Sequence, residues 1–300
     1  MEGMSWESWM RAWRIHSTTK AFQSRVDTAK RVIDAGMKHG QMYCSLSGGK
    51  DSVAMVGVID ECGLSDRVPS VHAHTAIDYP DTLDVVNAVA DKLNLELEIV
   101  EPTDLEPHVM RIAKKYGTTP PQPGVNGYDE WDLIRAVPQN IDLPTALPDI
   151  GRALAAGNMC IAHMYATGRD GAFVGIRADE SAARRWYARR WGSSHSYADG
   201  THSVTPLLAW SGIDVFAYLV SRELPIHPWY RHAYEAGRGV EPPERLRVDL
   251  GVPPAFPASR GAAQLIARVY PDFWRRLTAI RPEMCLYTSR RSTMGSSEGA

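Results

Sequence analysis

Apolar residues in the first hundred positions alternate between helical spacing and short continuous runs. Over residues 18–39 they recur every three or four positions and end at glycines, which predicts an amphipathic helix. The next apolar run, 42–46, is short and continuous, as expected of a buried strand. The same alternation predicts further helices and strands at about 51–62 (helix), 68–74 (strand), 81–93 (helix) and 95–100 (strand).

This repeated order of strand and helix predicts an α/β fold. We expect a parallel, doubly wound sheet with helices on both faces, in which ligands bind outside the carboxyl ends of the strands. Another strand is predicted at 172–176 and a helix with a serine start at 211–224. The segment 117–149 is rich in proline and glycine, which indicates a long irregular insertion, a lid or a substrate loop.

The sequence predicts one domain followed by a C-terminal extension. Residues 1–230 are expected to form the α/β domain, and the arginine-rich residues 231–300 a C-terminal extension packed on its core. With 300 residues, of which 44% are hydrophobic, the chain can bury a substantial core. A net charge of −2 argues against binding nucleic acid or membranes through bulk charge. No signal peptide or membrane span is indicated, so the expected location is cytoplasmic.

The four cysteines are too far apart to form a paired metal or redox motif. They are Cys44, Cys62, Cys160 and Cys285. No C-x-x-C pair is present, so we expect neither a zinc site, an iron-sulfur cluster nor a dithiol centre. The first three lie in apolar segments and are predicted to be buried structural thiols.

A short loop of small and charged residues separates the first predicted strand from its helix. It reads Ser47-Gly48-Gly49-Lys50-Asp51. Glycines allow backbone N–H groups to approach a phosphate closely, the following helix adds partial positive charge, and Lys50 adds a full one. Because Asp51 stands where a Walker A loop needs Ser or Thr, the loop is not an ordinary P-loop.

The segment "SGGKDS", from Ser47 to Ser52, resembles the PP-loop of the adenine nucleotide alpha-hydrolase superfamily. Two later segments narrow the resemblance to the phosphoadenylyl-sulfate (PAPS) reductase family. "HTAIDYPDT" (74–82) is similar to that family's D-T-G-x-x-F-P-E-T pattern, and "GIRADESAAR" (175–184), followed by "TPLLAWSGIDVFAYL", to its third signature. The resemblance covers about residues 42–230 and implies a Rossmann-like fold that binds ATP or PAPS.

The resemblance assigns roles to the loop residues. Ser47, Gly48, Gly49 and Ser52 would cradle phosphates, and Lys50 would pair with them. Asp51 would cap the helix or help to place Mg²⁺. The resemblance to the family, and not the composition of the loop, implies these roles of the individual residues.

The later motifs are expected to complete the site. Arg177, directly after a strand, would capture a phosphate or sulfate oxygen pair, with Glu180, Ser181 and Arg184 at the family's spacing. The nucleoside would lie near His74 and Asp78.

In the second motif, His74 replaces the family's leading aspartate and Ala76 its glycine, which departs from the usual adenosine contact.

The stretch 177–191 is predicted to form one arginine-rich helix. Its last arginines, Arg185, Arg189 and Arg190, would form a solvated face or supply contacts to nucleic-acid phosphates.

Three functions remain open at this point. The leading one is an enzyme that binds ATP with Mg²⁺, cleaves the bond between the α and β phosphates and adenylates an acceptor. The second is reduction of PAPS by a thiol, with Cys285 as nucleophile and a thioredoxin-type partner; Cys285 lies near the C-terminus, as the family's nucleophile does, but without the glycine and histidine of E-C-G-x-H. The third is a nucleotide-binding regulatory subunit, and a homodimer is left open.

Overall fold

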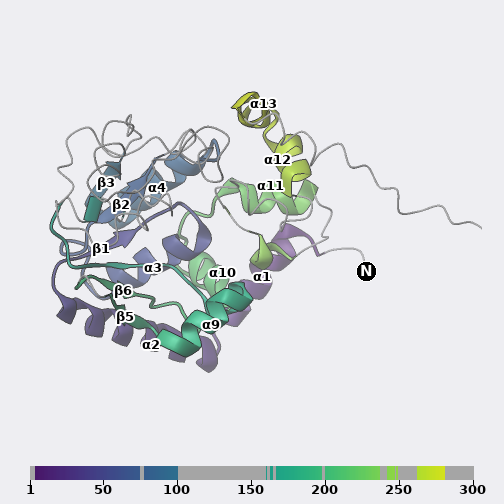
Figure 1. Cartoon of the computed structure of the whole chain (residues 1–300). Coiled ribbons are helices and arrows are strands. Elements are labelled where there is room, and N and C mark those ends of the chain that lie inside the picture. Colours follow the sequence, from purple (N-terminus) through teal and green to yellow (C-terminus); the bar gives the residue numbers. More distant parts are fainter. Residues whose placement is uncertain are drawn as a thin grey trace, which may run out of the picture.

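The computed structural model describes residues 4–74, 78–100, 160, 163–164, 167–197, 200–236, 242–246, 248 and 262–280. These residues form a six-stranded sheet with helices packed against it (Figure 1). The strands are β1 (Met42–Ser45), β2 (Ser70–Ala73), β3 (Leu97–Val100), β4 (Gly171–Phe173), β5 (Ser194–Ser196) and β6 (His202–Val204). The α-helices are α1 (Trp6–Ser17), α2 (Lys20–Gly36), α3 (Lys50–Glu61), α4 (Thr82–Leu93), α9 (Ala182–Trp191), α10 (Gly212–Ser221), α11 (Pro228–Ala236), α12 (Ala262–Val269) and α13 (Pro271–Ile280). The short 3-10 helices are η1 (Met37–His39), η2 (Ala178–Glu180) and η3 (Pro243–Arg245).

The strand order is β3-β2-β1-β4-β6-β5, which confirms the doubly wound class. Strand β1 pairs in parallel with β2 on one side and with β4 on the other. The chain order reverses between β1 and β4, and the carboxyl ends of these strands therefore flank a topological switch point. One part of the prediction was wrong, because the sheet is not wholly parallel: the edge strand β5 runs antiparallel to β6. The short connection between these two strands permits only the antiparallel arrangement.

Helical residues lie against both faces of the sheet, as predicted. Successive strand residues point to opposite faces. From β1 and the residue after it, Cys44 and Leu46 join the main core with α2, α3 and α4, whereas Tyr43 packs on the other face with Cys160 and Met164, which have helical backbone. The apolar run of β1 is therefore buried on both sides.

Most predicted elements are present with small shifts of their ends. The predicted helix over 18–39 is α2 followed by η1, and the side chain of Thr19 caps its start. The predicted strand over 172–176 is shorter, ending at Phe173. The helix over 211–224 is α10, with Ser211 as its N-cap. The predicted insertion at 117–149 lies outside the described residues.

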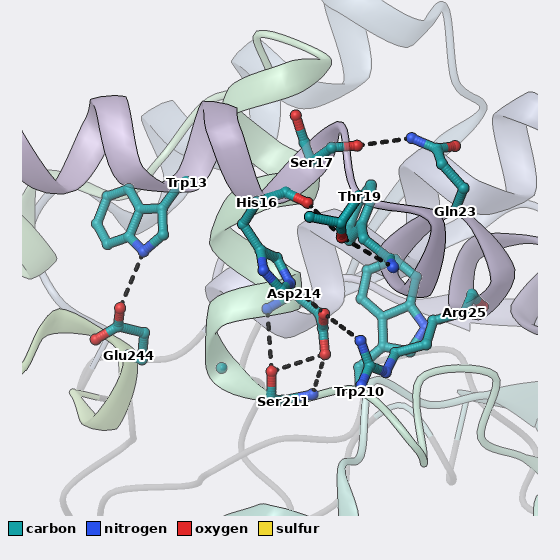
Figure 2. A network of polar contacts seen from close by, with 12 residues as sticks. Trp13, His16, Ser17, Thr19, Gln23, Arg25, Trp210, Ser211, Asp214 and Glu244 are labelled. Atoms are coloured by element: carbon teal, nitrogen blue, oxygen red, sulfur yellow. Dashed lines mark hydrogen bonds and ion pairs between the residues drawn. The ribbon is translucent and has the colours of Figure 1, made fainter.

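Helix α1 packs along α10, although the apolar pattern before residue 18 predicts no element. The Trp13 ring stacks on Phe216 of α10, with ring centroids 4.3 Å apart. Its indole Nε1 donates a hydrogen bond of 2.9 Å to Glu244 Oε1 (Figure 2). At the end of α1, His16 Nε2 lies 2.8 Å from Asp214 Oδ1. Trp6 and Trp13 thus form the buried face of this unpredicted helix.

The stretch 177–191 is not one helix, which corrects the prediction. Residues 178–180 form the 3-10 helix η2, and Ser181 then adopts extended backbone with φ −162° and ψ 166°. The Ser181 side chain accepts a hydrogen bond from the Arg184 N–H and caps α9. Arg177 consequently lies in the segment after β4, on a different element from the arginines of α9.

The described residues after 231 continue α11 to Ala236 and then form η3, α12 and α13. Helix α12 packs on α11 and α13, and η3 approaches α10 and α11. The division of the chain at residue 230 stays a prediction. None of the described helices is long and apolar enough to cross a membrane.

Candidate functional site

The loop between β1 and α3 is held in shape by its own serines. The Ser47 N–H donates a hydrogen bond of 3.1 Å to Ser52 Oγ, and Ser52 Oγ donates one of 2.9 Å to the Gly49 carbonyl. Gly48 has φ +73°, and a Cβ there would stand 3.1 Å from Thr82 Cγ2. The turn therefore needs glycine at position 48, both for its backbone conformation and for the close approach of α4.

Helix α3 starts at this loop without a side-chain cap of its own. Gly49 is the N-cap and offers no side-chain acceptor to the first turn. The Lys50 N–H instead donates a hydrogen bond of 3.0 Å to the hydroxyl of Tyr230, a buried residue of α11. The amides at a helix start carry partial positive charge, which favours an anion in front of them.

Three charged side chains meet behind the loop. Lys50 Nζ lies 3.2 Å from Asp51 Oδ2, and Arg177 Nε lies 2.5 Å from Asp51 Oδ1. Arg177 also pairs through Nη1 with Asp179, whose side chain is half exposed. Lys50 Nζ donates a further hydrogen bond of 2.8 Å to the Leu246 carbonyl.

This pairing decides the protonation of the cluster. Burial alone would raise the pKa of the Asp51 carboxyl, but Lys50 and Arg177 outweigh burial and lower that pKa. Burial alone would lower the pKa of Lys50 and of Arg177, but Asp51 raises both. All three groups are therefore charged at neutral pH.

Gly175 allows β4 and α3 to come together. A Cβ at this position would lie 2.9 Å from the backbone carbon of Asp51 and 2.9 Å from the Ser52 nitrogen. No larger residue fits without moving the helix start. This close approach lets Arg177, two residues further on, reach Asp51.

The same loop and arginine segment fall inside a match to a known family. A family model described as the phosphoadenosine phosphosulfate reductase domain matches residues 41–236. The chain belongs to this family. A search of the curated proteins gave no match to the sequence.

Several solved structures are similar to this chain. The phosphoadenylyl-sulfate (PAPS) reductase from Candida auris, solved as a phosphate complex, is 16% identical, with 75% of this chain and 91% of that chain covered and a TM-score of 0.43. The FMN adenylyltransferase of Candida glabrata is 11% identical, with 77% and 70% covered and a TM-score of 0.45. The NH3-dependent NAD synthetase from Campylobacter jejuni is 14% identical, with 91% and 99% covered and a TM-score of 0.40.

The family's second motif lies at the carboxyl end of β2, beside the loop. His74 follows the strand, and its Nδ1 lies 3.1 Å from Asp78 Oδ2. His72, inside β2, donates from Nδ1 to the carbonyl of Leu46, which directly precedes the loop. The two predicted nucleoside-site residues are thus brought together, with His72 as a third member that the sequence did not single out.

The turn that carries Arg177 is held by Glu180, Ser181 and Arg184. The Arg177 N–H donates a hydrogen bond of 3.1 Å to Glu180 Oε2, which also lies 3.6 Å from Arg184 Nε. Ser181 caps α9. Their hydrogen bonds fix the turn that carries Arg177.

Asp51 does not fit the expected role of a Mg²⁺ ligand. One carboxylate oxygen accepts from Arg177 and the other from Lys50. A metal would have to displace a buried cation from each oxygen that it took. Asp51 instead holds the two cations in place.

The described cysteines are poor nucleophiles. Burial raises the pKa of Cys44 well above its ordinary value, and burial raises the pKa of Cys62 and of Cys160 to about 11. These three thiols stay protonated near neutral pH. Cys285 lies outside the described residues, so its role stays a prediction.

Two site residues were missed because they come from distant segments. The Tyr230 hydroxyl caps α3, and its ring lies 5.2 Å from Lys50 Nζ. The Leu246 backbone reaches Lys50 from beyond α11. A carbonyl gives no sequence signal, and Tyr230 looks like an ordinary aromatic of an amphipathic helix.

Proposed function

We propose that the chain binds ATP with its phosphates at the start of α3, cleaves the bond between the α and β phosphates, and transfers the adenylyl group to an acceptor. The observation that carries this proposal is the cluster of Lys50, Asp51 and Arg177 beside a helix start whose N-cap residue, Gly49, has no side chain to cap it. It lies at the switch point between β1 and β4, where doubly wound sheets bind their ligands.

The cations of the cluster are placed to receive an anion. Lys50 and Arg177 are both buried, and Asp51 is the carboxylate that pairs with both of them. Arg177 has a further carboxylate partner, Asp179, which lies toward solvent with its side chain 47% exposed. A phosphate oxygen pair presents the same geometry to a guanidinium as a carboxylate does, and could take the place of Asp179 at Arg177.

The chain's own groups suit phosphoryl chemistry. An acceptor that attacks the α phosphorus releases pyrophosphate, and negative charge gathers on the bridging and non-bridging oxygens. The amides at the start of α3 would hold these oxygens, and Lys50 and Arg177 would neutralise the charge that develops. Mg²⁺ would enter with the nucleotide as its counter-ion, because Asp51 is already committed to the two cations.

The experiment is a product analysis with the full chain. The purified protein is incubated with Mg²⁺ and either ATP or PAPS plus reduced thioredoxin, and the nucleotides are separated by anion exchange. We expect pyrophosphate from ATP, with AMP as the second product where water takes the adenylyl group; this turnover should be lost in Lys50→Gln and kept in the control Arg25→Gln, which changes a cation outside the loop.

Other products would contradict the proposal. Sulfite and adenosine 3',5'-bisphosphate formed from PAPS, and abolished by Cys285→Ser, would establish the thiol-dependent reductase instead. The regulatory subunit would be favoured if the chain bound ATP tightly but did not turn it over when acceptors of different classes were added.

A further inference from the structure

The carboxyl end of β2 gathers two histidines and an aspartate. His72 and His74 are two residues apart and lie on the same face of the strand, and the chain returns to them at Asp78 before α4 begins. One potential ligand atom from each residue lies within 4.8 Å of the other two. Ligand atoms that share one ion at bonds of about 2.1 Å lie up to about 4.2 Å apart, so small side-chain rotations would close the set.

His72 is oriented as a metal-binding histidine would be. Its Nδ1 lies 2.9 Å from the Leu46 carbonyl, which can only accept, so Nδ1 carries the proton. Nε2, the ring nitrogen that is left to bind a metal, lies on the side of Asp78, 3.6 Å from Oδ2. Histidines that bind metals usually donate their other ring N–H to a backbone carbonyl or a carboxylate in this way.

The His72 Nε2 atom lacks a partner that would explain its position. His72 is only 1% exposed, and among the described residues its Nε2 makes no hydrogen bond. The nearest carboxylate oxygen, Asp78 Oδ2, is 3.6 Å away, which is too long for a hydrogen bond. A buried acceptor left unpaired is destabilising, and a cation between these atoms would remove that cost.

We propose that His72, His74 and Asp78 bind a divalent transition-metal ion such as Zn²⁺, Co²⁺ or Fe²⁺. Imidazole nitrogens with a carboxylate favour such ions over Mg²⁺, which prefers oxygen ligands alone. The side chain of His74 is 35% exposed and gives the ion a path from solvent.

Three protein ligands leave at least one coordination position open. That position can hold water or an oxygen or nitrogen of a substrate, as in metal sites that take part in reactions. The ligand set adjoins the phosphate loop, because the carbonyl that orients His72 belongs to the residue before Ser47. The proposal goes beyond the nucleotide site and does not depend on it.

The test is a titration of the full chain with Co²⁺ after metal has been removed by a chelator and dialysis. Visible absorbance and calorimetry should report one Co²⁺ per chain. We expect His74→Asn and Asp78→Asn each to weaken binding at least 10-fold. The control His16→Gln should bind like the wild type, because His16 is also partly exposed and paired with a carboxylate but belongs to no group of three possible ligands within the part of the chain that the structure describes.

A second measurement uses the wild type alone and does not depend on folded variants. Bound Co²⁺ should protect His74 from acylation by diethyl pyrocarbonate, read by mass spectrometry, and leave His16 reactive. The proposal would be overturned if the wild type did not bind Co²⁺, or if His74→Asn and Asp78→Asn both bound it as tightly as the wild type. A sulfur-to-cobalt charge-transfer band would also overturn it, because the proposed ligands contain no sulfur. Since no ATP is present, failure here would leave the proposed nucleotide chemistry untouched.

Discussion

Helices α3 and α10 both begin beside an aspartate that pairs with two other side chains, and in each case at least one partner comes from a distant part of the chain. At α10, Asp214 accepts from His16 and from Arg25, and it forms a capping box with Ser211 (Figure 2). At α3, Asp51 accepts from Lys50 and from Arg177. The two helix starts are thus similar in charge but differ in how the helix itself is capped.

We expect the cap to decide which helix start can take a ligand. Ser211 satisfies the first turn of α10 from within, and the pairing groups there are partly exposed, 30% for His16 and 40% for Arg25. Gly49 offers the first turn of α3 no side chain, and its cations are buried. We therefore expect the capped network at the start of α10 to stabilise the fold, and the buried cations at the start of α3 to bind an anion.

The largest expected effect comes from Arg177. Arg177→Lys keeps the charge but loses the planar fork that binds two oxygens, so ATP affinity should fall about 100-fold. Arg25→Lys, the matched change at α10, should leave ATP affinity unchanged. Calorimetric titration of both variants with Mg-ATP checks this, and equal losses of affinity would remove the distinction between the two clusters.

Asp214 should matter for stability alone. Asp214→Asn removes the charge that His16, Arg25 and Ser211 share, and should lower the free energy of unfolding by about 2 kcal/mol. Urea denaturation measures the loss, and the affinity for ATP, measured on the folded variant, should not change. A large drop in that affinity would show that the α10 network also serves the nucleotide.

Acid should lower the stability of the protein through His227, which lies near the loop between β1 and α3. Burial lowers the pKa of His227 to about 4, and its Nε2 lies 3.2 Å from Thr82 Oγ1, next to Gly48. The unfolded histidine binds a proton below about pH 6.5, whereas the folded one stays neutral until about pH 4. Stability should therefore fall as the pH drops below 6.5.

Between pH 7 and pH 5 the expected loss is about 2 kcal/mol. Urea denaturation at both pH values measures it, and His227→Asn should flatten the slope. An unchanged slope in that variant would place the acid sensitivity elsewhere.

Gly49→Ser would give α3 the kind of cap that α10 has. A Cβ at Gly49 meets only ordinary contacts, the nearest being Ser47 Oγ at 3.5 Å. The new hydroxyl should compete with phosphate for the first-turn amides and weaken ATP binding about 10-fold, while stability changes by only a few tenths of a kcal/mol. Unchanged ATP affinity would mean that these amides do not contact the phosphates.

The smallest effect is expected from Ser211→Ala. Loss of this cap should lower the free energy of unfolding by about 1 kcal/mol, with no change in ATP affinity. Together with Gly49→Ser, this variant tests the comparison in both directions, since one removes a cap and the other adds one.

The loop and its neighbours could be predicted because their chemistry is local. A strand, a run of glycines, a lysine and a helix follow one another within 42–61, and Arg177 follows directly after its own strand. The prediction of one helix over 177–191 was wrong for a physical reason. The Ser181 side chain caps α9, so this helix begins only after Ser181 and is separate from the residues before it. The helical spacing of the arginines does not reveal this break.

The remaining parts of the site depend on contacts between distant segments. Tyr230 and Leu246 reach Lys50 across more than 170 positions, as the separations of 180 and 196 residues show. His72 lies in a strand and looks like an interior residue until its Nε2 is seen to point toward Asp78. Strands β5 and β6 are three residues each, too short for a periodic pattern.

Hydrogen–deuterium exchange with and without Mg-ATP tests the central claim most directly. If phosphates bind at the start of α3, where Gly49 supplies no side-chain cap, the amides of residues 48–52 should gain protection on adding nucleotide, while those of residues 211–214 should not change. Protection confined to other segments, or no change at 48–52 at saturating nucleotide, would contradict the assignment of the α3 helix start as the phosphate site.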